Sequence, residues 1–435
     1  MTGEKGDIRR LLDEAPMARP QIAAIILCVL LNALDGFDVL AISFASPGIA
    51  AEWRVDRAAL GLVLSMELIG MAAGSVLLGG LADRMGRRPT ILLCLVIMAG
   101  GMLAATQAFS IFSLSAIRLA TGLGIGGMLA STNAMVAELS NARSRSLAVA
   151  VMAAGYPIGA IAGGSIASLI LVSGEWRNVF LFGAIMTGFF LPLAYMLLPE
   201  SIGFLLQRRP AGALGRVNAL LVRYRHQPVS ALPPPDGIAP RASVAALFAP
   251  GLARATILLT AAYFAHVMTF YFILKWVPKI VVDMGYAASA AGGVLVWANV
   301  GGLAGALLLS LLSWRISIRA LVIAAMLAST VMVTIFGQGQ SSLSGLAAVA
   351  AAAGFFTNAG VVGLYAIIAQ SFPTSVRGGG TGVVIGFGRG GAALGPIIAG
   401  FLFSLNFGLP VVALAMALGS LTAAGALLLL RPVQS

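Results

Sequence analysis

The sequence contains little charge and few of the side chains that carry enzyme chemistry. Only 10% of its 435 residues are Asp, Glu, Lys or Arg, against roughly 25% in a soluble globular protein. Its two cysteines, Cys28 and Cys94, both lie inside apolar stretches, so no disulfide framework is expected. With two histidines, the chain has no Cys/His cluster for a metal, and it has no phosphate-binding loop with its Lys. These absences argue against an enzyme and against an ATP-driven pump, and we expect no metal and no cofactor.

Apolar residues are what the sequence has instead. They make up 59% of the chain, together with 53 glycines, and small residues let helix axes approach closely in lipid. The net charge of +12 sits in short Arg clusters between long apolar runs. That distribution is typical of loops that set membrane topology. The composition therefore predicts a protein embedded in a lipid bilayer, with no nucleic acid as a partner.

The apolar runs predict an all-α membrane protein with twelve transmembrane helices, since a span needs about 20 mostly apolar residues. The expected spans are 21–47, 57–82, 89–109, 111–137, 145–172, 177–198, 254–281, 287–312, 317–336, 343–370, 376–404 and 408–430. Six precede a polar stretch with a proline cluster, and six follow it. The expected organisation is a cytoplasmic tail (1–20), a six-helix bundle (21–198), a cytoplasmic interdomain loop (199–253), a second six-helix bundle (254–430) and a cytoplasmic C-terminal tail (431–435).

The distribution of Lys and Arg between the loops predicts the orientation of these spans. With both ends of the chain inside, 20 of them fall in cytoplasmic segments, and four fall in outer loops: Arg54, Arg57, Arg177 and Lys279. The positive-inside rule therefore favours cytoplasmic termini. The mixed-charge segment 1–20 lacks a small-residue cleavage site, so it predicts a retained tail in a bacterial inner-membrane protein.

The two halves of the sequence resemble each other. An offset of 231 or 232 residues places Gly74, Arg84, Arg88 and Arg145 over Gly305, Arg315, Arg319 and Arg377. Two six-helix repeats that enclose a site near the midplane are a plan used by transporters. We therefore expect two pseudo-symmetric bundles with a substrate site between them, in a protein that functions as a monomer.

The loop between the second and third spans carries the sequence GGLADRMGRRPT (79–90). Gly86 allows a short turn, and Asp83 lies at a helix end beside Arg84, Arg87 and Arg88. Such a network of charges can lock one packing of two bundles and release it in another. Topology alone would explain the arginines, but it would not explain Asp83 or the glycines.

This loop resembles the signature G-x-x-x-D-R-x-G-R-R of the major facilitator superfamily. The segments RLATGLGIGG (118–127), LPESIGFLLQRRP (198–210) and SVRGGGTGVVIGFGRGGAALGP (375–396) fit the same superfamily. The resemblance covers essentially the whole chain and implies the major facilitator fold, with Glu138 and Arg143 joining the gate. The second-half counterpart, SLLSWRISIRA (310–320), has Trp314 in place of the acid, which leaves a second gate at Trp314 and Arg315 open.

Two acidic residues in the first span point to the substrate class. Asp35 and Asp38 are three residues apart and share one helical face, in the middle third of the span. Carboxylates at that depth are costly unless paired or protonated. The motif D-G-F-D resembles the hallmark of the aromatic acid/proton symporter family, which implies that protons enter together with benzoate-type acids and that both residues couple proton entry. The simpler alternative is that one Asp pairs with Arg118 to hold helices together.

Positive charges within the spans are candidates to bind a substrate carboxylate. Arg389 lies twelve residues into the eleventh span, among four glycines that leave room for a ligand, and its planar guanidinium matches a carboxylate. The alternative for Arg389 is an ion pair with Glu67. We expect Arg118 to pair with Asp35 and Asp38, and to contact substrate only secondarily. Lys275 is nearer the outer end of its span and is expected to reach toward the outer surface, with a functional role as the alternative.

The remaining candidates are His266 and several aromatic residues. His266 lies at mid-depth in the seventh span, where it could bind a ring hydroxyl, carry a proton or simply pack. Residues that could line an aromatic pocket, but that could equally be packing, are Phe37, Tyr263, Phe270, Trp297, Tyr365 and Phe387.

These features favour a secondary transporter that imports small aromatic carboxylates with protons by alternating access. A drug or metabolite antiporter stays open because GYPIGAIAGG (155–164) loosely resembles an antiporter element. A sugar porter stays open because of PES (199–201) and GRR (86–88), although the C-terminal element of that family is missing. The sequence does not choose among benzoate, hydroxybenzoates, vanillate and ring-cleavage products.

Overall fold

The computed structural model describes residues 8–233, 244–373 and 376–430. The ends of the expected tails (1–7 and 431–435) and part of the expected interdomain loop (234–243) lie outside these ranges. The described residues form twelve helical segments that are long and apolar enough to cross a membrane. The protein is therefore an all-helical, multi-pass membrane protein, as the apolar runs predicted.

The spans divide into two sets of six. The first set is α2 (Arg19–Trp53), α3 (Arg57–Met85), α4 (Arg87–Thr106), α5 (Ile111–Leu139), α6 (Arg145–Ile170), extended by the 3-10 turn η1 (Leu171–Ser173), and α7 (Arg177–Leu197). The second set is α10 (Ala253–Asp283), α11 (Ala288–Leu312), α12 (Ile318–Gly337), α13 (Leu343–Gln370), the pair α14 (Arg377–Gly388) and α15 (Gly390–Ser404), and α16 (Leu409–Leu429). Every predicted span end lies within six residues of the observed end.

One predicted span is not a single helix. The segment expected as one helix over 376–404 divides into α14 and α15 at Arg389. Four glycines surround this residue, at positions 386, 388, 390 and 391, and glycine is a weak helix former because it loses the most backbone freedom. The interruption is confined to Arg389, whose backbone keeps right-handed helical dihedrals and still donates to the Ile385 carbonyl at 2.9 Å.

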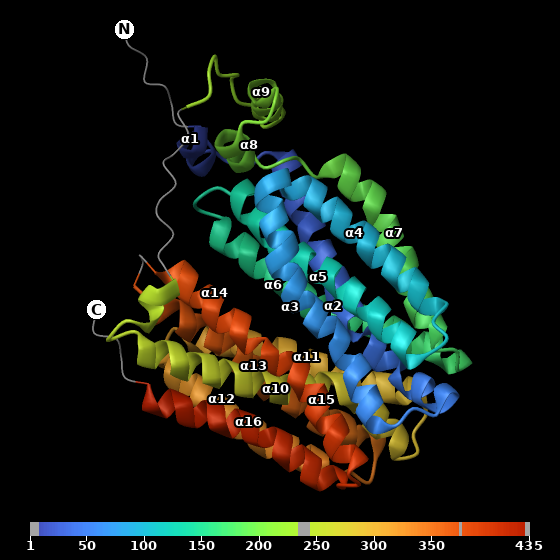
Figure 1. Ribbon diagram of the computed structural model, residues 1–435. Coiled ribbons are helices and arrows are strands. Elements are labelled where there is room, and N and C mark those ends of the chain that lie inside the picture. Colours follow the sequence, from blue (N-terminus) through green and yellow to red (C-terminus); the bar gives the residue numbers. More distant parts are fainter. Residues whose placement is uncertain (1–7, 234–243, 374–375, 431–435) are drawn as a thin grey trace.

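The two sets form separate bundles with equivalent packing (Figure 1). In the first bundle α3 packs on α5, α2 on α6 and α4 on α7; in the second α11 packs on α13, α10 on α14 and α15, and α12 on α16. Gly74 and Gly305, matched by the sequence repeat, both lie against a backbone carbonyl of the facing helix, that of Leu123 and of Phe355. A methyl group at either glycine would push the helices apart, so the repeat records a shared packing requirement.

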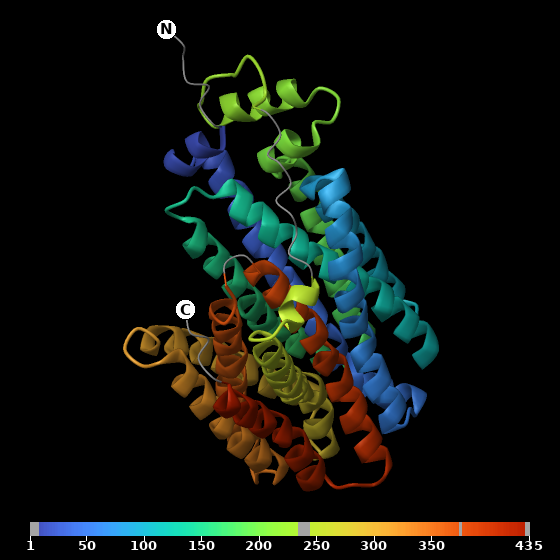
Figure 2. The same ribbon diagram turned by 60° about the vertical axis from the view of Figure 1, so that its left-hand side comes forward.

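The end at which α2 begins and α16 ends is called the terminal side, and the opposite end the far side. The bundles meet through α3 with α15, α6 with α11 and α2 with α10. The α3 contact is made by α15, the far-side half of its span, through Gly61 against Pro396 and Gly400. In Figures 1 and 2 the bundles converge toward this far side and spread toward the terminal side. The structure is closed on the far side.

Short helices cover the terminal side of the first bundle, where the sequence predicted only a tail and a loop (Figure 1). These are α1 (Ile8–Glu14), α8 (Ile202–Arg208) and α9 (Ala213–Arg223); a 3-10 turn, η2 (Val244–Phe248), precedes α10. Asp13 of α1 forms an ion pair with Arg145 at the start of α6. The Asp13 carbonyl also accepts a hydrogen bond from Ala142 N at 3.0 Å. The tail is thereby attached to the α5–α6 turn.

Candidate functional site

Two carboxyl groups of α2 lie in the interior without partners. Asp35 is 1% exposed and Asp38 is fully buried. None of their four carboxylate oxygens accepts a hydrogen bond from any described residue. Keeping such groups ionised costs several kcal/mol, at order of magnitude. A proton on either carboxyl removes that cost, so this arrangement suits groups that gain and lose a proton.

A third buried acid, Glu67 of α3, is held by two cations. One of its carboxylate oxygens pairs with Arg118 of α5, and the other lies 3.5 Å from Nζ of Lys275 of α10. All three side chains are fully buried. Arg118 belongs to the same bundle as Glu67, whereas Lys275 belongs to the other bundle, so this triad crosses the interface between the bundles.

Two predictions about these cations are wrong. Arg118 was expected to pair with the carboxylates of Asp35 and Asp38, but it pairs with Glu67 and reaches Asp38 only at the backbone carbonyl, at 2.9 Å. The physical reason is helix packing, because Gly122 brings α5 directly against the backbone of Glu67. Lys275 was expected to reach toward the outer surface, but it is fully buried.

Arg389 faces a group of tyrosines rather than an acid. It interacts electrostatically with Tyr263, Tyr365 and Tyr271, and the Tyr263 and Tyr365 hydroxyls are hydrogen-bonded at 3.0 Å. Gly388 lies against the Tyr263 ring, where a Cβ atom would collide. Glu67, the alternative partner, is taken by other cations. Within the described ranges, Arg389 has no acidic partner, so its guanidinium is available to an anion.

Tyrosines also connect the two groups of buried charges. Tyr271 of α10 interacts electrostatically with both Arg389 and Glu67. Tyr156 of α6 interacts with Tyr271, Glu67 and Asp35. Tyr271 and Tyr156 therefore lie between Arg389 and Asp35 at the bundle interface, although the Tyr156 hydroxyl has no hydrogen-bond partner among the described residues. Neither tyrosine was singled out from the sequence, because nothing in the helical pattern shows that they face each other.

Three other candidates lie in different surroundings. The ring of His266 hydrogen-bonds Ser420 Oγ at 2.9 Å and the Thr357 carbonyl at 2.8 Å, which satisfies both nitrogens inside the second bundle and supports the packing alternative. Phe37 is buried in the first bundle against Gly163 and in edge contact with Phe182, so packing explains it too. Phe387 is 71% exposed on α14. Of the predicted aromatic residues, Tyr263 and Tyr365 are the ones that the structure brings to Arg389.

The predicted gate residues form a network at the terminal side. Arg87 Nη1 pairs with Asp83 at 2.7 Å, and Arg87 Nη2 pairs with Glu138 of α5 at 3.2 Å. Arg88 instead donates to the Tyr195 carbonyl at 2.6 Å and stacks over the Tyr195 ring. The centre of the network is therefore Arg87.

The other members of the predicted gate are exposed. Arg84 and Arg143 are both exposed, and neither forms an ion pair with a described residue. The second-half counterpart also lies on the surface, where Trp314 is 86% exposed. The expectation that these arginines join the network is not met in this conformation.

Sequence reasoning missed one residue of this network, Glu200. Its carboxylate accepts hydrogen bonds from the backbone N–H groups of Arg87 at 2.9 Å, Arg88 at 3.4 Å and Ser201 at 2.8 Å. It thereby caps the first turn of α4, whose N–H groups have no helical partner. Burial raises the pKa of the Glu200 carboxyl. The segment PES was its signal in the sequence, but the pattern does not show which helix it caps.

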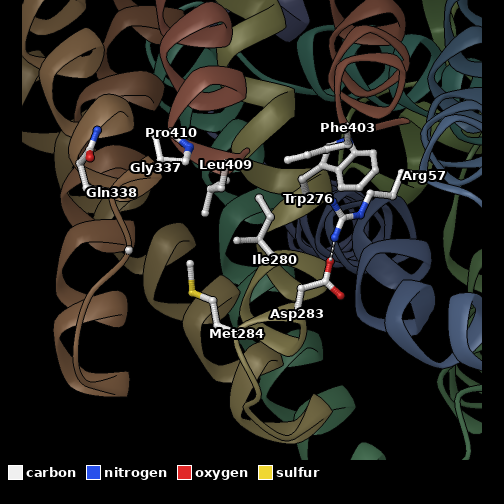
Figure 3. A pocket seen from close by; sticks show the side chains of 11 residues that line it. Arg57, Trp276, Ile280, Asp283, Met284, Gly337, Gln338, Phe403, Leu409 and Pro410 are labelled. Atoms are coloured by element: carbon white, nitrogen blue, oxygen red, sulfur yellow. Dashed lines mark hydrogen bonds and ion pairs between the residues drawn. The ribbon is translucent and has the colours of Figure 1, made fainter. Parts of the chain in front are cut away.

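A pocket of about 330 Å³ lies on the far side, away from the buried acids (Figure 3). Its wall includes Trp276, Phe403 and Leu409. At one edge Arg57 of α3 pairs with Asp283 of α10 at 3.1 Å. This ion pair joins the two bundles where they are closed.

Comparisons with known proteins agree with this architecture. The model of the Major Facilitator Superfamily matches residues 28–309 and 259–435. The chain is 30% identical to "Gallate transporter" of Pseudomonas putida over 97% of this chain and 94% of that one. It is 29% identical to "4-hydroxybenzoate transporter PcaK" of Acinetobacter baylyi, over 93% of this chain and 90% of that one.

Solved structures show the same fold. The D-xylose-proton symporter superposes with a TM-score of 0.72 at 17% identity, over 95% of this chain and 98% of that one. Twelve spans in two equivalent bundles, the Asp83–Arg87–Glu138 network and a family match along nearly the whole chain lead to one assignment. The chain belongs to the Major Facilitator Superfamily, and its relatives include proteins named as transporters of aromatic acids.

Proposed function

We propose that the protein imports small aromatic carboxylates of the benzoate and hydroxybenzoate type together with protons. The terminal side is the cytoplasmic side of a bacterial inner membrane in this proposal, as the distribution of Lys and Arg predicts. The closed far side then faces outward, and the structure represents an inward-facing conformation. Alternating access exchanges this conformation for one in which the far side opens.

The observation that carries the proposal is the environment of Arg389. Its guanidinium lies at a helix interruption, beside tyrosine hydroxyls and without an acidic partner among the described residues. A guanidinium binds a carboxylate through two parallel hydrogen bonds. An aromatic ring that carries hydroxyl groups can pack against the rings of Tyr263, Tyr271 and Tyr365. Its hydroxyl groups can form hydrogen bonds with the tyrosine hydroxyls. Relatives named for gallate and 4-hydroxybenzoate fit such a ligand.

Asp35 and Asp38 supply the proton sites in this proposal. An ionised carboxylate near a bound anionic substrate is unfavourable, so protonation favours loading and release of the proton favours unloading. Tyr156 and Tyr271 lie between Asp35 and Arg389. Protonation of Asp35 and binding of the substrate at Arg389 can therefore influence each other. Asp35 is the stronger candidate, since the Asp38 backbone is already bound by Arg118.

The charge network at the terminal side acts as the gate in this proposal. Arg87 holds Asp83 and Glu138, which are at the ends of α3 and α5, and Arg84, Arg88 and Arg143 lie in the same two turns. When the terminal side closes, exposed arginines there can donate hydrogen bonds to backbone carbonyls at helix ends of the second bundle, since the one acidic residue of that bundle, Asp283, lies on the far side. Such exchanges of charged contacts switch between two packings.

The test is uptake of radiolabelled 4-hydroxybenzoate into proteoliposomes. An imposed gradient, acidic outside, should drive accumulation above the external concentration, and an uncoupler should abolish it. Unlabelled benzoate should compete, whereas xylose should not. Uptake that ignores the proton gradient would refute symport, and absence of any 4-hydroxybenzoate transport by an active preparation would refute the substrate class.

A further inference from the structure

Two ion pairs of opposite arrangement connect α3 and α10 across the bundle interface. In the outer pair, α3 supplies the cation Arg57 and α10 supplies the acid Asp283. In the inner pair, α3 supplies the acid Glu67 and α10 supplies the cation Lys275. The outer pair is partly exposed, with side-chain exposures of 44% and 32%, whereas both side chains of the inner pair are fully buried. Opening the far side must separate both pairs.

Separation affects the two members of the inner pair differently. Glu67 keeps a partner, because Arg118 belongs to its own bundle. Lys275 keeps none. Its ammonium group donates to the Val39 carbonyl of α2 and to Glu67 of α3, both in the first bundle. Among the described residues of its own bundle, it has no hydrogen-bond or ion-pair partner.

An open far side therefore exposes an uncompensated ammonium group on the wall of the second bundle. A buried or half-buried cation without a partner is unfavourable, and the carboxylate of an incoming substrate would restore the lost ion pair. Glu67 and the substrate would then be alternative partners of the same amine, one when the far side is closed and the other when it is open.

The position of Lys275 suits this role. It lies eight residues before the far-side end of α10, so about 12 Å deep, whereas Arg389 lies fifteen residues before the end of α15, so about 22 Å deep. An anion that enters from the far side therefore meets Lys275 before it reaches Arg389. Tyr271 is four residues earlier on α10 and therefore on the same helical face, and it interacts with Arg389. One face of α10 thus leads from Lys275 to Arg389.

We propose that Lys275 binds the substrate carboxylate when the far side is open and forms its ion pair with Glu67 again when the far side closes. The proposal rests on the proposed function, because it requires an anionic substrate that enters from the far side. It makes Lys275 a loading residue for one side of the membrane, distinct from Arg389, which serves both conformations.

The experiment compares the two faces of the membrane. Zero-trans uptake of radiolabelled 4-hydroxybenzoate is measured in right-side-out and in inside-out vesicles that contain the wild type, Lys275→Met or Lys275→Arg. Methionine fills the buried space of the lysine without charge, and Glu67 retains Arg118. Lys279→Met is the matched control, since Lys279 lies one turn further out on α10 and pairs with Asp283 in the same bundle.

Lys275→Met should raise KM at least about tenfold in right-side-out vesicles and leave KM within about twofold in inside-out vesicles. Lys275→Arg should restore part of the outer affinity, and Lys279→Met should change neither face. Equal changes at both faces, or no change at the outer face, would overturn the role of Lys275 while leaving the proposed function intact. A wild type that transports no 4-hydroxybenzoate in either orientation would overturn both.

Discussion

Removing the guanidinium of Arg389 should abolish discrimination between an aromatic acid and its ester. A bidentate contact supplies two charge-assisted hydrogen bonds, each of about 1.5–3 kcal/mol. Losing both should cost at least about 3 kcal/mol, or roughly 150-fold or more in Kd. The fold should survive Arg389→Ala, because the neighbours of Arg389 are tyrosine hydroxyls and no buried acid loses its partner.

The assay measures Kd in detergent for 4-hydroxybenzoate and for its methyl ester, which has the same ring and hydroxyl group but no charge. The wild type should bind the acid far more tightly than the ester. Arg389→Ala should bind both with similar, weak affinity, and Arg389→Lys should recover less than half of the lost free energy because an ammonium group cannot form the planar fork.

Arg315→Ala serves as the control, since Arg315 is exposed at the surface and its loss should leave the acid-to-ester ratio unchanged. An unchanged ratio in Arg389→Ala would refute the assignment of Arg389 to the carboxylate. Full affinity in Arg389→Lys would reduce the role of Arg389 to that of a general positive charge.

Three further outcomes follow from the structure. Asp83→Asn should slow uptake but keep Kd for 4-hydroxybenzoate within about threefold, because the residue lies at the gate; an unchanged uptake rate would contradict the gate. His266→Ala should lower the free energy of unfolding by about 1–3 kcal/mol, because Ser420 and the Thr357 carbonyl lose their hydrogen-bond partner, and it should change Kd little. A large loss of affinity in a stable protein would contradict the packing role of His266. Alkaline phosphatase fused after residue 225 should be inactive, and an active fusion would place the terminal side outside the cytoplasm.

The helices, the repeat and the charge network of Asp83, Arg87 and Glu138 could be predicted from the sequence because they depend on local patterns. Runs of apolar residues fix the number of spans, since water-free surroundings require every backbone group to be paired within a helix. The motif around Asp83 and Arg87 concentrates its partners within a few residues, and Glu138 follows from the family resemblance. The short helices α8 and α9 were missed because, at 7 and 11 residues, they are too short to produce the spanning apolar run on which the prediction relied.

Pairings between distant helices could not be predicted. Asp35 and Asp38 were the partners expected for Arg118, and Glu67 was considered only for Arg389. The actual pairing depends on glycine contacts between α3 and α5 that set which side chain faces the arginine. For the same reason, the sequence could not show that Lys275 crosses to the other bundle, or that Tyr156 and Tyr271 meet. Depth along a span is readable from sequence, whereas rotation about the helix axis relative to neighbouring helices is set by packing.

The central claim, that a buried carboxyl of α2 couples proton entry to substrate uptake, is tested most directly by Asp35→Asn in proteoliposomes. Asparagine resembles the protonated acid in size and cannot release a proton. We expect this variant still to exchange labelled 4-hydroxybenzoate for unlabelled substrate in counterflow, but no longer to accumulate it when a proton gradient is imposed. Proton-driven accumulation at the wild-type level in Asp35→Asn would contradict a coupling role for Asp35.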